Sequence, residues 1–598
     1  MNKSIQIAKI VKQNATKFLS SRTLLALTLA ISASAVSAAP PLPGGATTGG
    51  NLPRLDDRKL IQPTDPAIFP IPPVMQRPLD IDEGPRIIVT EFILEGAQDH
   101  PEHGVSIAAA RKILEASRAE RPEGFTINRL QEVANKITTY YRKAGYIVAQ
   151  AFVPQQDVSG GKVVIKVLEG QLGNVLSEGN KKYSSALLAA PFQGLIGKAL
   201  HKDDIESAIL IITDYPGLTA FAVFKPGEKV GTTDLVLKIK DEDAVDATVT
   251  WDNHGSQFTG EYRGRFDVSV NNIFGYADSL DMTGLYTSKP ENSFFVAVGY
   301  EIPIFTPEYR LGIRHSRNEF VIDPSLSGSL IGGDTQIGSA YVRKNIVRSR
   351  AKNIYSTLDV SIKSAKTEIS NSVVSVDDLS VLSLELGFDG IDTELGGINQ
   401  GTIKFSRGYA NVFGAMGDNG TEGSSRTGGS GRHAGAEFTK IFLDYARLQA
   451  VKKNQSILVN FNAQYSNDLL VSLEQMAIGG PDSVRAYAPS DFLVDSGIFM
   501  SVEFVFNAPG FADKPAFAGR TWGEVFQVSL FGDGAMGWTN DPTVDQEEKI
   551  SVAGYGVGLQ LRLPNEFDAR LDFSRPLGDR KASNDRETQV YFKLNYTF

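Results

Sequence analysis

The stretch "AIGGPDSVRAYAPSD" holds the residue whose type and setting most suggest a functional role, Arg485. It lies in a long connection between two alternating segments, among glycines and apolar residues such as Val484 and Tyr487. A half-buried cation is costly unless a carboxylate pairs with it. Two interpretations stay open from these residues: an ordinary surface loop with an exposed arginine, or a loop folded into the protein, where Arg485 needs an acidic partner.

Other patterns that resemble chemical sites are weaker. His100 and His103 in "HPEH" are metal-ligand types, but no third ligand stands at a useful spacing, so we expect a solvated loop and no metal. "GDGAMG" at 532–537 fits a dinucleotide fingerprint by its letters, yet its glycines run from a strand into a loop and not into a helix. We find no catalytic constellation among the six histidines, and no cysteine for thiolate chemistry. The sequence predicts neither an enzyme nor a cofactor.

The N-terminus has the features of a secretory signal. A basic region precedes the apolar core "LLALTLAISASAV", and "VSA" supplies small residues for cleavage before Ala39. The apolar run is short and no stop-transfer charges follow, so a membrane anchor fits less well. We therefore predict a signal peptide over 1–38 and a mature protein outside the cytoplasm, away from ATP.

Composition narrows the class of protein. A chain of 598 residues is too long for one ordinary domain. The net charge of −9 argues against a nucleic-acid partner. Beyond the N-terminus, no continuous apolar run is long enough for a membrane-spanning helix.

The elements that must position Arg485 fall into three blocks. A Pro/Gly-rich stretch over 39–85 predicts an extended linker, with no convincing helix to act as a plug. Two modules, 86–169 and 170–243, then repeat a β-α-α-β-β order, which indicates an internal duplication. Two unrelated small α/β domains are the alternative.

The third block, 244–598, alternates polar and apolar residues in sixteen segments. An even number of short strands, joined by connections that tend to be long on one side and short on the other, is typical of outer-membrane barrels. The turn "NAPGFADKPAFAGRTWG" is an exception, long on the short side. A soluble sandwich of sixteen strands would be oversized. The predicted fold is an all-β, 16-stranded transmembrane β-barrel preceded by two α/β modules.

Together, the export signal, the tandem modules, the barrel and "GGPDSVRAY" resemble two-partner secretion outer-membrane transporters of the FhaC/ShlB/HecB type, in the superfamily that includes BamA. The resemblance covers nearly all of the chain from about residue 85. It implies that the modules are periplasmic POTRA domains. It also implies that a loop over about 468–496 enters the barrel with a Val-Arg-Gly-Tyr tip. Val484, Arg485 and Tyr487 match this tip, whereas Ala486 replaces the glycine and makes the backbone geometry of the tip less certain.

The same resemblance implies a partner for the arginine. In the family an aspartate of a Phe-x-Asp-x-Gly motif on strand thirteen holds it, and "FGDGA" supplies Phe531 and Asp533, with Ala535 in place of the last glycine. We therefore expect a lock between Arg485 and Asp533.

The implied function is an outer-membrane pore that recognises and secretes one large unfolded exoprotein, an adhesin, haemolysin or contact-dependent toxin, without ATP. The cargo would bind the POTRA modules by β-augmentation, at the edge of "YIVAQAFVP" or of "LTAFAVFKP". The pore is expected to be monomeric and surrounded by outer-membrane lipid. A BamA-like assembly factor is the alternative, although two modules are fewer than that role usually has. A plain diffusion porin would not need the modules.

The last strand, "TQVYFKLNYTF", supports the membrane setting. One face of it is apolar and ends in Tyr596 and Phe598, which we expect to face lipid. This ending resembles the signal that outer-membrane proteins present to the barrel-assembly machinery.

Overall fold

The computed structural model describes residues 44–53, 84–290, 292–418, 423–563 and 566–598. The predicted signal peptide and residues 54–83 of the predicted linker lie outside this part of the chain. None of the helices in the described ranges is both long and apolar enough to cross a membrane.

The first α/β module is a three-stranded sheet of order β1-β3-β2, packed against two helices. Helix α3 begins at its N-cap Thr126, whose side chain accepts a hydrogen bond from the Arg129 N–H. Its apolar face, with Leu130 and Ile137, is buried in the same core as Val163 and Ile165 of β3. The elements are β1 (Glu91–Glu95), η2 (Pro101–His103), α2 (Ile107–Ala119), α3 (Ile127–Lys143), β2 (Gln150–Phe152) and β3 (Lys162–Leu168).

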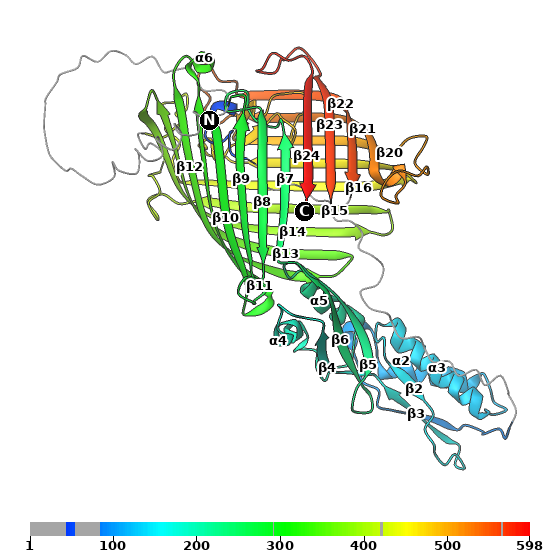
Figure 1. Ribbon diagram of the computed structural model, residues 1–598. Helices are drawn as coiled ribbons and strands as arrows, with labels where there is room; N and C mark the ends of the chain where they lie inside the picture. Colours follow the sequence, from blue (N-terminus) through cyan, green and yellow to red (C-terminus); the bar gives the residue numbers. More distant parts are fainter. Residues whose placement is uncertain (1–43, 54–83, 291, 419–422, 564–565) are drawn as a thin grey trace. The chain divides into compact units, whose positions relative to one another are not determined.

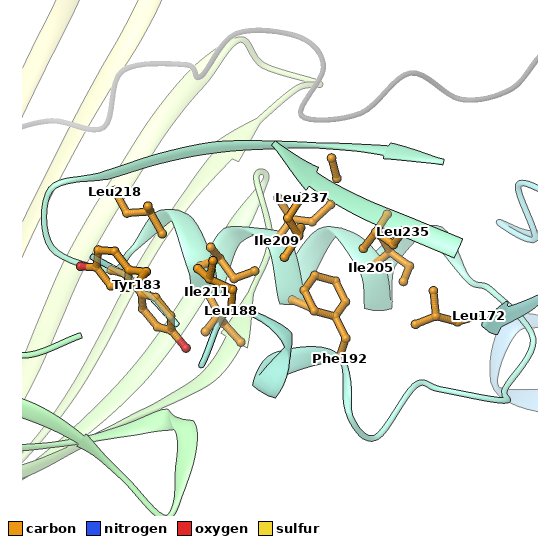
Figure 2. Packing of buried hydrophobic residues seen from close by; sticks show 14 of the residues in the cluster. Leu172, Tyr183, Leu188, Phe192, Ile205, Ile209, Ile211, Leu218, Leu235 and Leu237 are labelled. Atoms are coloured by element: carbon orange, nitrogen blue, oxygen red, sulfur yellow. The ribbon is translucent and has the colours of Figure 1, made fainter. Parts of the chain in front are cut away.

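The second module has the same plan, with sheet order β4-β6-β5. Figure 2 shows its core, in which Ile205 and Ile209 of α5 pack with Leu235 and Leu237 of β6. The elements are β4 (Gln171–Glu178), α4 (Ser185–Ala189), η3 (Ala190–Phe192), α5 (Lys202–Thr213), β5 (Leu218–Pro226) and β6 (Thr232–Glu242). The repeated β-α-α-β-β order predicted from the sequence is confirmed.

The remaining chain closes into an antiparallel barrel of sixteen strands, with β24 beside β7 (Figure 1). Closure leaves no open edge, since Lys593–Thr597 of β24 pairs with Thr248–Asp252 of β7. The strands are β7 (Val245–Asp252), β8 (Tyr262–Asn271), β9 (Ser279–Ser288), β10 (Ser293–Ile304), β11 (Thr306–Ile322), β12 (Ile331–Arg348), β13 (Lys352–Ile369), β14 (Ser372–Asp392), β15 (Gly397–Gly408), β16 (Phe438–Lys452), β17 (Gln455–Tyr465), β20 (Ser496–Asn507), β21 (Phe526–Trp538), β22 (Lys549–Leu563), β23 (Phe567–Pro576) and β24 (Gln589–Thr597). Short helices α6 (Pro324–Ser327) and α7 (Trp522–Val525) lie in two of the connections.

Side chains alternate between the two faces of the barrel wall. On β7, Val249 and Trp251 are 40% and 52% exposed, whereas Thr250 and Asp252 are 3% and 2% exposed. An exposed apolar face opposite a polar face that is covered inside is the pattern of a barrel in lipid. The sixteen segments predicted from alternation all lie in strands of this barrel.

Several strands are longer than a membrane crossing requires. About 9–11 residues cross a bilayer, yet β14 has 21 residues and β12 and β13 have 18 each. These strands therefore continue beyond the membrane, and β13 and β14 are joined by only two residues, 370–371, on the side predicted to carry long loops. The long turn at 508–525 is present as predicted, and in it Phe511 and Trp522 pack edge to face.

Candidate functional site

The site is built around the connection between β17 and β20, residues 466–495, hereafter the inward loop. Its two limbs pair as a small antiparallel hairpin, β18 (Met476–Ile478) with β19 (Phe492–Val494). Its apolar residues are buried against inward-facing residues of the barrel wall, among them Phe499 of β20 and Val552 of β22. The loop is therefore folded into the barrel, and the interpretation as an exposed surface loop is wrong.

Arg485 is 5% exposed at the tip of this loop and contacts two neighbouring strands. Its Nε and Nη2 donate to the two carboxylate oxygens of Asp533 on β21, at 2.9 and 2.8 Å. Nη1 donates to Glu503 Oε2 at 3.0 Å and Nη2 to Ser501 Oγ at 3.1 Å, both on β20. A two-point guanidinium–carboxylate pair fixes orientation as well as position. The expected contact between Arg485 and Asp533 is thus present.

A second arginine completes the charge cluster. Arg570 on β23 donates to Glu503, at 3.0 Å, and to Asp572, at 2.8 Å. Asp572 also lies 3.8 Å from Nη1 of Arg485. Two cations therefore face three carboxylates in a buried setting, where each charge depends on the others for compensation.

The phenyl ring of Phe531 adds a contact of another kind. The guanidinium carbon of Arg485 lies 3.3 Å from the centre of that ring, which is a cation–π contact. Ala535, which stands where the family motif has glycine, is buried in the cluster that holds the tip. The methyl group of Ala535 therefore packs against the loop.

The tip itself is a tight turn. The Tyr487 N–H donates to the Val484 carbonyl at 3.1 Å, and Ala486, the third residue of the turn, does not have a positive φ. A type I turn accepts alanine at this position. Ala486 therefore stands at the tip without a left-handed backbone conformation. Tyr487 is buried, and its carbonyl accepts a hydrogen bond from the Tyr591 hydroxyl at 2.7 Å.

The described part of the predicted linker lies against the inward loop and is not an extended spacer. Residues 44–53 form a 3-10 turn, η1 (Gly44–Ala46), and contain no α-helix. The Thr48 hydroxyl lies 3.0 Å from that of Ser472 on the inward loop, and Ser490 Oγ donates to the Gly50 carbonyl at 2.8 Å. On the other side of the segment, Ser256 Oγ, in the connection between β7 and β8, donates to the Gly45 carbonyl at 2.9 Å, and Ala46 is buried with Phe320 of β11. The segment thus occupies space between the inward loop and the barrel wall.

The sequence predicted a solvated loop for the histidines of "HPEH", but both of their rings contact other side chains. His100 Nε2 lies 3.0 Å from Glu169, and the ring of His103 stacks on that of His201 in the second module with centroids 3.5 Å apart. Among the described residues, no group of three or more metal-ligating side chains is placed to hold an ion. His103 instead packs against the second module, and His100 pairs with Glu169 at the end of the first.

Sequence reasoning missed the partners Ser501, Glu503, Arg570 and Asp572. Alternation does place them on the polar faces of β20 and β23, so the sequence indicates that these side chains point into the barrel. Which of them reaches Arg485 depends on contacts between strands far apart in the chain, for which alternation carries no signal. At the end of the chain, Tyr596 and Phe598 are exposed, as expected for residues that face lipid, and their rings lie 4.7 Å apart.

Comparison with known proteins identifies the family. The family model described as haemolysin secretion/activation protein ShlB/FhaC/HecB matches residues 231–561, and that of the ShlB-type POTRA domain matches 103–170. The heme/hemopexin transporter protein HuxB of Haemophilus influenzae is 25% identical over 480 residues, which cover 79% of this chain and 81% of that protein. The outer membrane transporter CdiB of Escherichia coli is 25% identical over 509 residues, covering 83% and 80%.

The fold agrees as well. The solved structure of CdiB from Escherichia coli superposes with a TM-score of 0.67 at 22% identity, over 89% of this chain and 94% of that one. A barrel of sixteen strands, a buried arginine at the tip of an inward loop and a family match over more than half of the chain point the same way. The chain belongs to the ShlB/FhaC/HecB haemolysin secretion/activation family and is a two-partner secretion transporter of the outer membrane, with its POTRA modules in the periplasm.

Proposed function

We propose that this transporter exports one large exoprotein in an unfolded state through the lumen of its barrel, with the inward loop as the movable obstacle. The observation that carries this proposal is the burial of Arg485 among Asp533, Glu503 and Asp572, because so many charge-assisted bonds fix the loop in one place on the wall. A loop held this firmly inside a secretion pore gives the protein a defined resting position from which transport begins.

The cargo is proposed to bind first at an edge of a POTRA sheet, and the edge of β5 suits it better than that of β2. The Ala151 N–H of β2 donates to Thr138 Oγ1 of α3, and the Ala149 carbonyl accepts from Arg142 Nε, so α3 already uses backbone groups along β2. Strand β5 is nine residues long, forms an outer strand of its sheet and exposes 45% of Phe221. Longer outer strands offer more backbone groups for β-augmentation.

Photo-crosslinking tests this choice. A photoreactive amino acid at Phe221 should form adducts with the cargo in the periplasm, and the same amino acid at Phe152 of β2 should form few. Adducts from Phe152 alone would overturn the assignment of the edge and leave the transport function untouched.

The driving force is proposed to come from folding of the cargo outside the cell, with the chain itself performing no chemical reaction. We further propose that the pore is monomeric and that the barrel-assembly machinery reads Tyr596 and Phe598 during insertion. The exported partner is to be identified by comparing proteins in the culture medium of a deletion strain and a complemented strain. Loss of one very large protein from the medium supports the proposal. A general loss of outer-membrane barrel proteins would instead support a BamA-like assembly role.

A further inference from the structure

A second buried ion-pair centre holds the inward loop at a place far from its tip. The side chain of Glu474, on the first limb of the loop, is 2% exposed. Its two carboxylate oxygens each lie 2.6 Å from a lysine Nζ, one of Lys363 on β13 and one of Lys440 on β16. The main-chain carbonyl of Glu474 also accepts from Lys440 Nζ and from Gln464 Nε2, both at 2.9 Å.

The two centres hold the loop to different stretches of the barrel wall. Lys363 lies on β13, whereas Ser574, whose Oγ donates to the Arg485 carbonyl at 2.6 Å, lies on β23. In the closed order β13-β14-β15-β16-β17-β20-β21-β22-β23 these two strands are eight places apart, half of the sixteen. The nearest partners of the two centres, Lys440 on β16 and Glu503 on β20, are only two places apart. The inward loop is therefore tied to the wall through two separate centres, which together reach from β13 to β23.

We propose that Glu474 is a second positioning residue for transport, which together with Lys363 and Lys440 holds the first limb of the inward loop to the wall, apart from the Arg485 centre. A loop tied to the wall at one centre can pivot about it, whereas a loop tied at two centres cannot. Closure of the resting lumen then depends on both centres. The inference rests on the proposed function in one respect, namely that the lumen is the route of the cargo.

The stem of the loop has its own support, which keeps the loop inside the barrel when Glu474 is changed. Arg426, from the connection between β15 and β16, donates to both carboxylate oxygens of Asp495, at 2.5 and 2.8 Å. It also donates to the Leu470 carbonyl at 2.6 Å. Loss of Glu474 pairing should therefore free the first limb of the loop without expelling the loop.

The test is the resting conductance of the purified full-length protein in planar lipid bilayers, without any cargo. Glu474→Gln keeps the shape of the side chain and removes its charge. Since a broken buried ion pair changes an equilibrium strongly, we expect the conducting fraction to rise about tenfold. Lys404→Met is the matched control, because Lys404 is also a lysine of the barrel, on the neighbouring β15, and Glu474 pairs with Lys363 and Lys440 instead.

A neutral triple variant separates positioning from folding. Glu474→Gln leaves two lysines without their carboxylate, so Glu474→Gln/Lys363→Met/Lys440→Met removes all three charges together. We expect the triple variant to conduct like Glu474→Gln while its barrel keeps the gel shift on heating that a folded barrel shows.

Each result decides the inference. Raised conductance in both Glu474 variants, with Lys404→Met at the wild-type level, supports it. A wild-type conductance in a folded triple variant overturns it, and so does an equal rise in Lys404→Met. Because no cargo is present, this failure would not touch the proposed secretion function, which the comparison of culture media tests separately.

Discussion

Arg485 and Asp533 meet through two parallel hydrogen bonds of 2.9 and 2.8 Å, and the Arg485 backbone N–H donates to the same carboxylate at 3.1 Å. Side chain and main chain of one loop residue are thus bound to one residue of the wall. The relationship fixes both where the tip lies and how its backbone is turned. It is the basis for the predictions that follow.

Replacing Arg485 by alanine should lower secretion of the partner by at least about tenfold while folded barrel remains in the outer membrane. Truncation leaves Asp533 buried without its cation, which costs about 3–5 kcal/mol, but Arg570 still compensates Glu503 and Asp572. Immunoblots of medium and of outer membranes measure the two effects. Arg575→Ala, an exposed arginine of the same barrel, is the control. Unchanged secretion would show that Arg485 has no role in transport. Loss of the barrel from the outer membrane would show that its role is structural.

Gly554 on β22 should not tolerate a side chain, because the tip packs against it. A Cβ at Gly554 would lie 2.3 Å from the Cβ of Ala486. We expect Gly554→Ala to displace the tip and reduce secretion, and Ala486→Gly in the same chain to restore it. Gly534→Ala on β21, where an added Cβ meets nothing within 4 Å, should behave like wild type. Failure of Ala486→Gly to rescue would place the defect at the other close contact of this Cβ, the Arg575 carbonyl oxygen at 3.0 Å, and not at the tip.

A disulfide across the barrel seam should leave secretion intact. The Thr248 and Thr597 hydroxyl oxygens lie 3.1 Å apart in directly paired strands, and the chain has no other cysteine to compete. Paired residues of this kind have Cα atoms about 4.5–5.5 Å apart, which suits a disulfide. Secretion by Thr248→Cys/Thr597→Cys is compared with and without reductant. If only reductant allowed export, the lateral opening of a BamA-like mechanism would be the better account.

Tethering the N-terminal segment to the inward loop should have the opposite result. The Thr48 and Ser472 hydroxyl oxygens are 3.0 Å apart, so Thr48→Cys/Ser472→Cys places two thiols together. We expect oxidation to stop export and reductant to restore it, because the cargo needs the space that 44–53 and the loop occupy. The two single-cysteine variants are the controls. Export that continued through a fully formed disulfide would show that this segment stays in place during transport.

Much of the architecture follows from local sequence. A period of two along sixteen segments indicates the strands and their two faces, because neighbouring side chains in a strand point to opposite sides. Helical periodicity interrupted by strands indicates the two modules in the same way. The ends of the strands were harder to predict from the sequence. At the start of β14, Val373 and Val374 are adjacent and both exposed, so alternation does not mark this end of the strand.

The site was predicted only in part, for a physical reason. Arg485 and Asp533 were paired through the family motif, while Glu503 and Asp572 carry no motif and differ from other lumen-facing acids only in their three-dimensional position. Glu474 and Lys363 are 111 residues apart in the sequence and meet where the inward loop lies against the wall. Such contacts depend on how the barrel closes and on the direction in which the loop runs. Local composition carries no information about either.

The central claim, passage of the cargo through the lumen, is tested most directly by crosslinking during transport. Alternation on β15 places Lys404 inside the barrel, between Ile403 and Phe405, which are each 46% exposed. A photoreactive amino acid replaces Lys404 in one strain and Ile403 in another, and adducts are identified by mass spectrometry. The account predicts adducts with the exported protein from position 404 and none from position 403. Adducts from position 403 alone, while secretion continues in both strains, would contradict it.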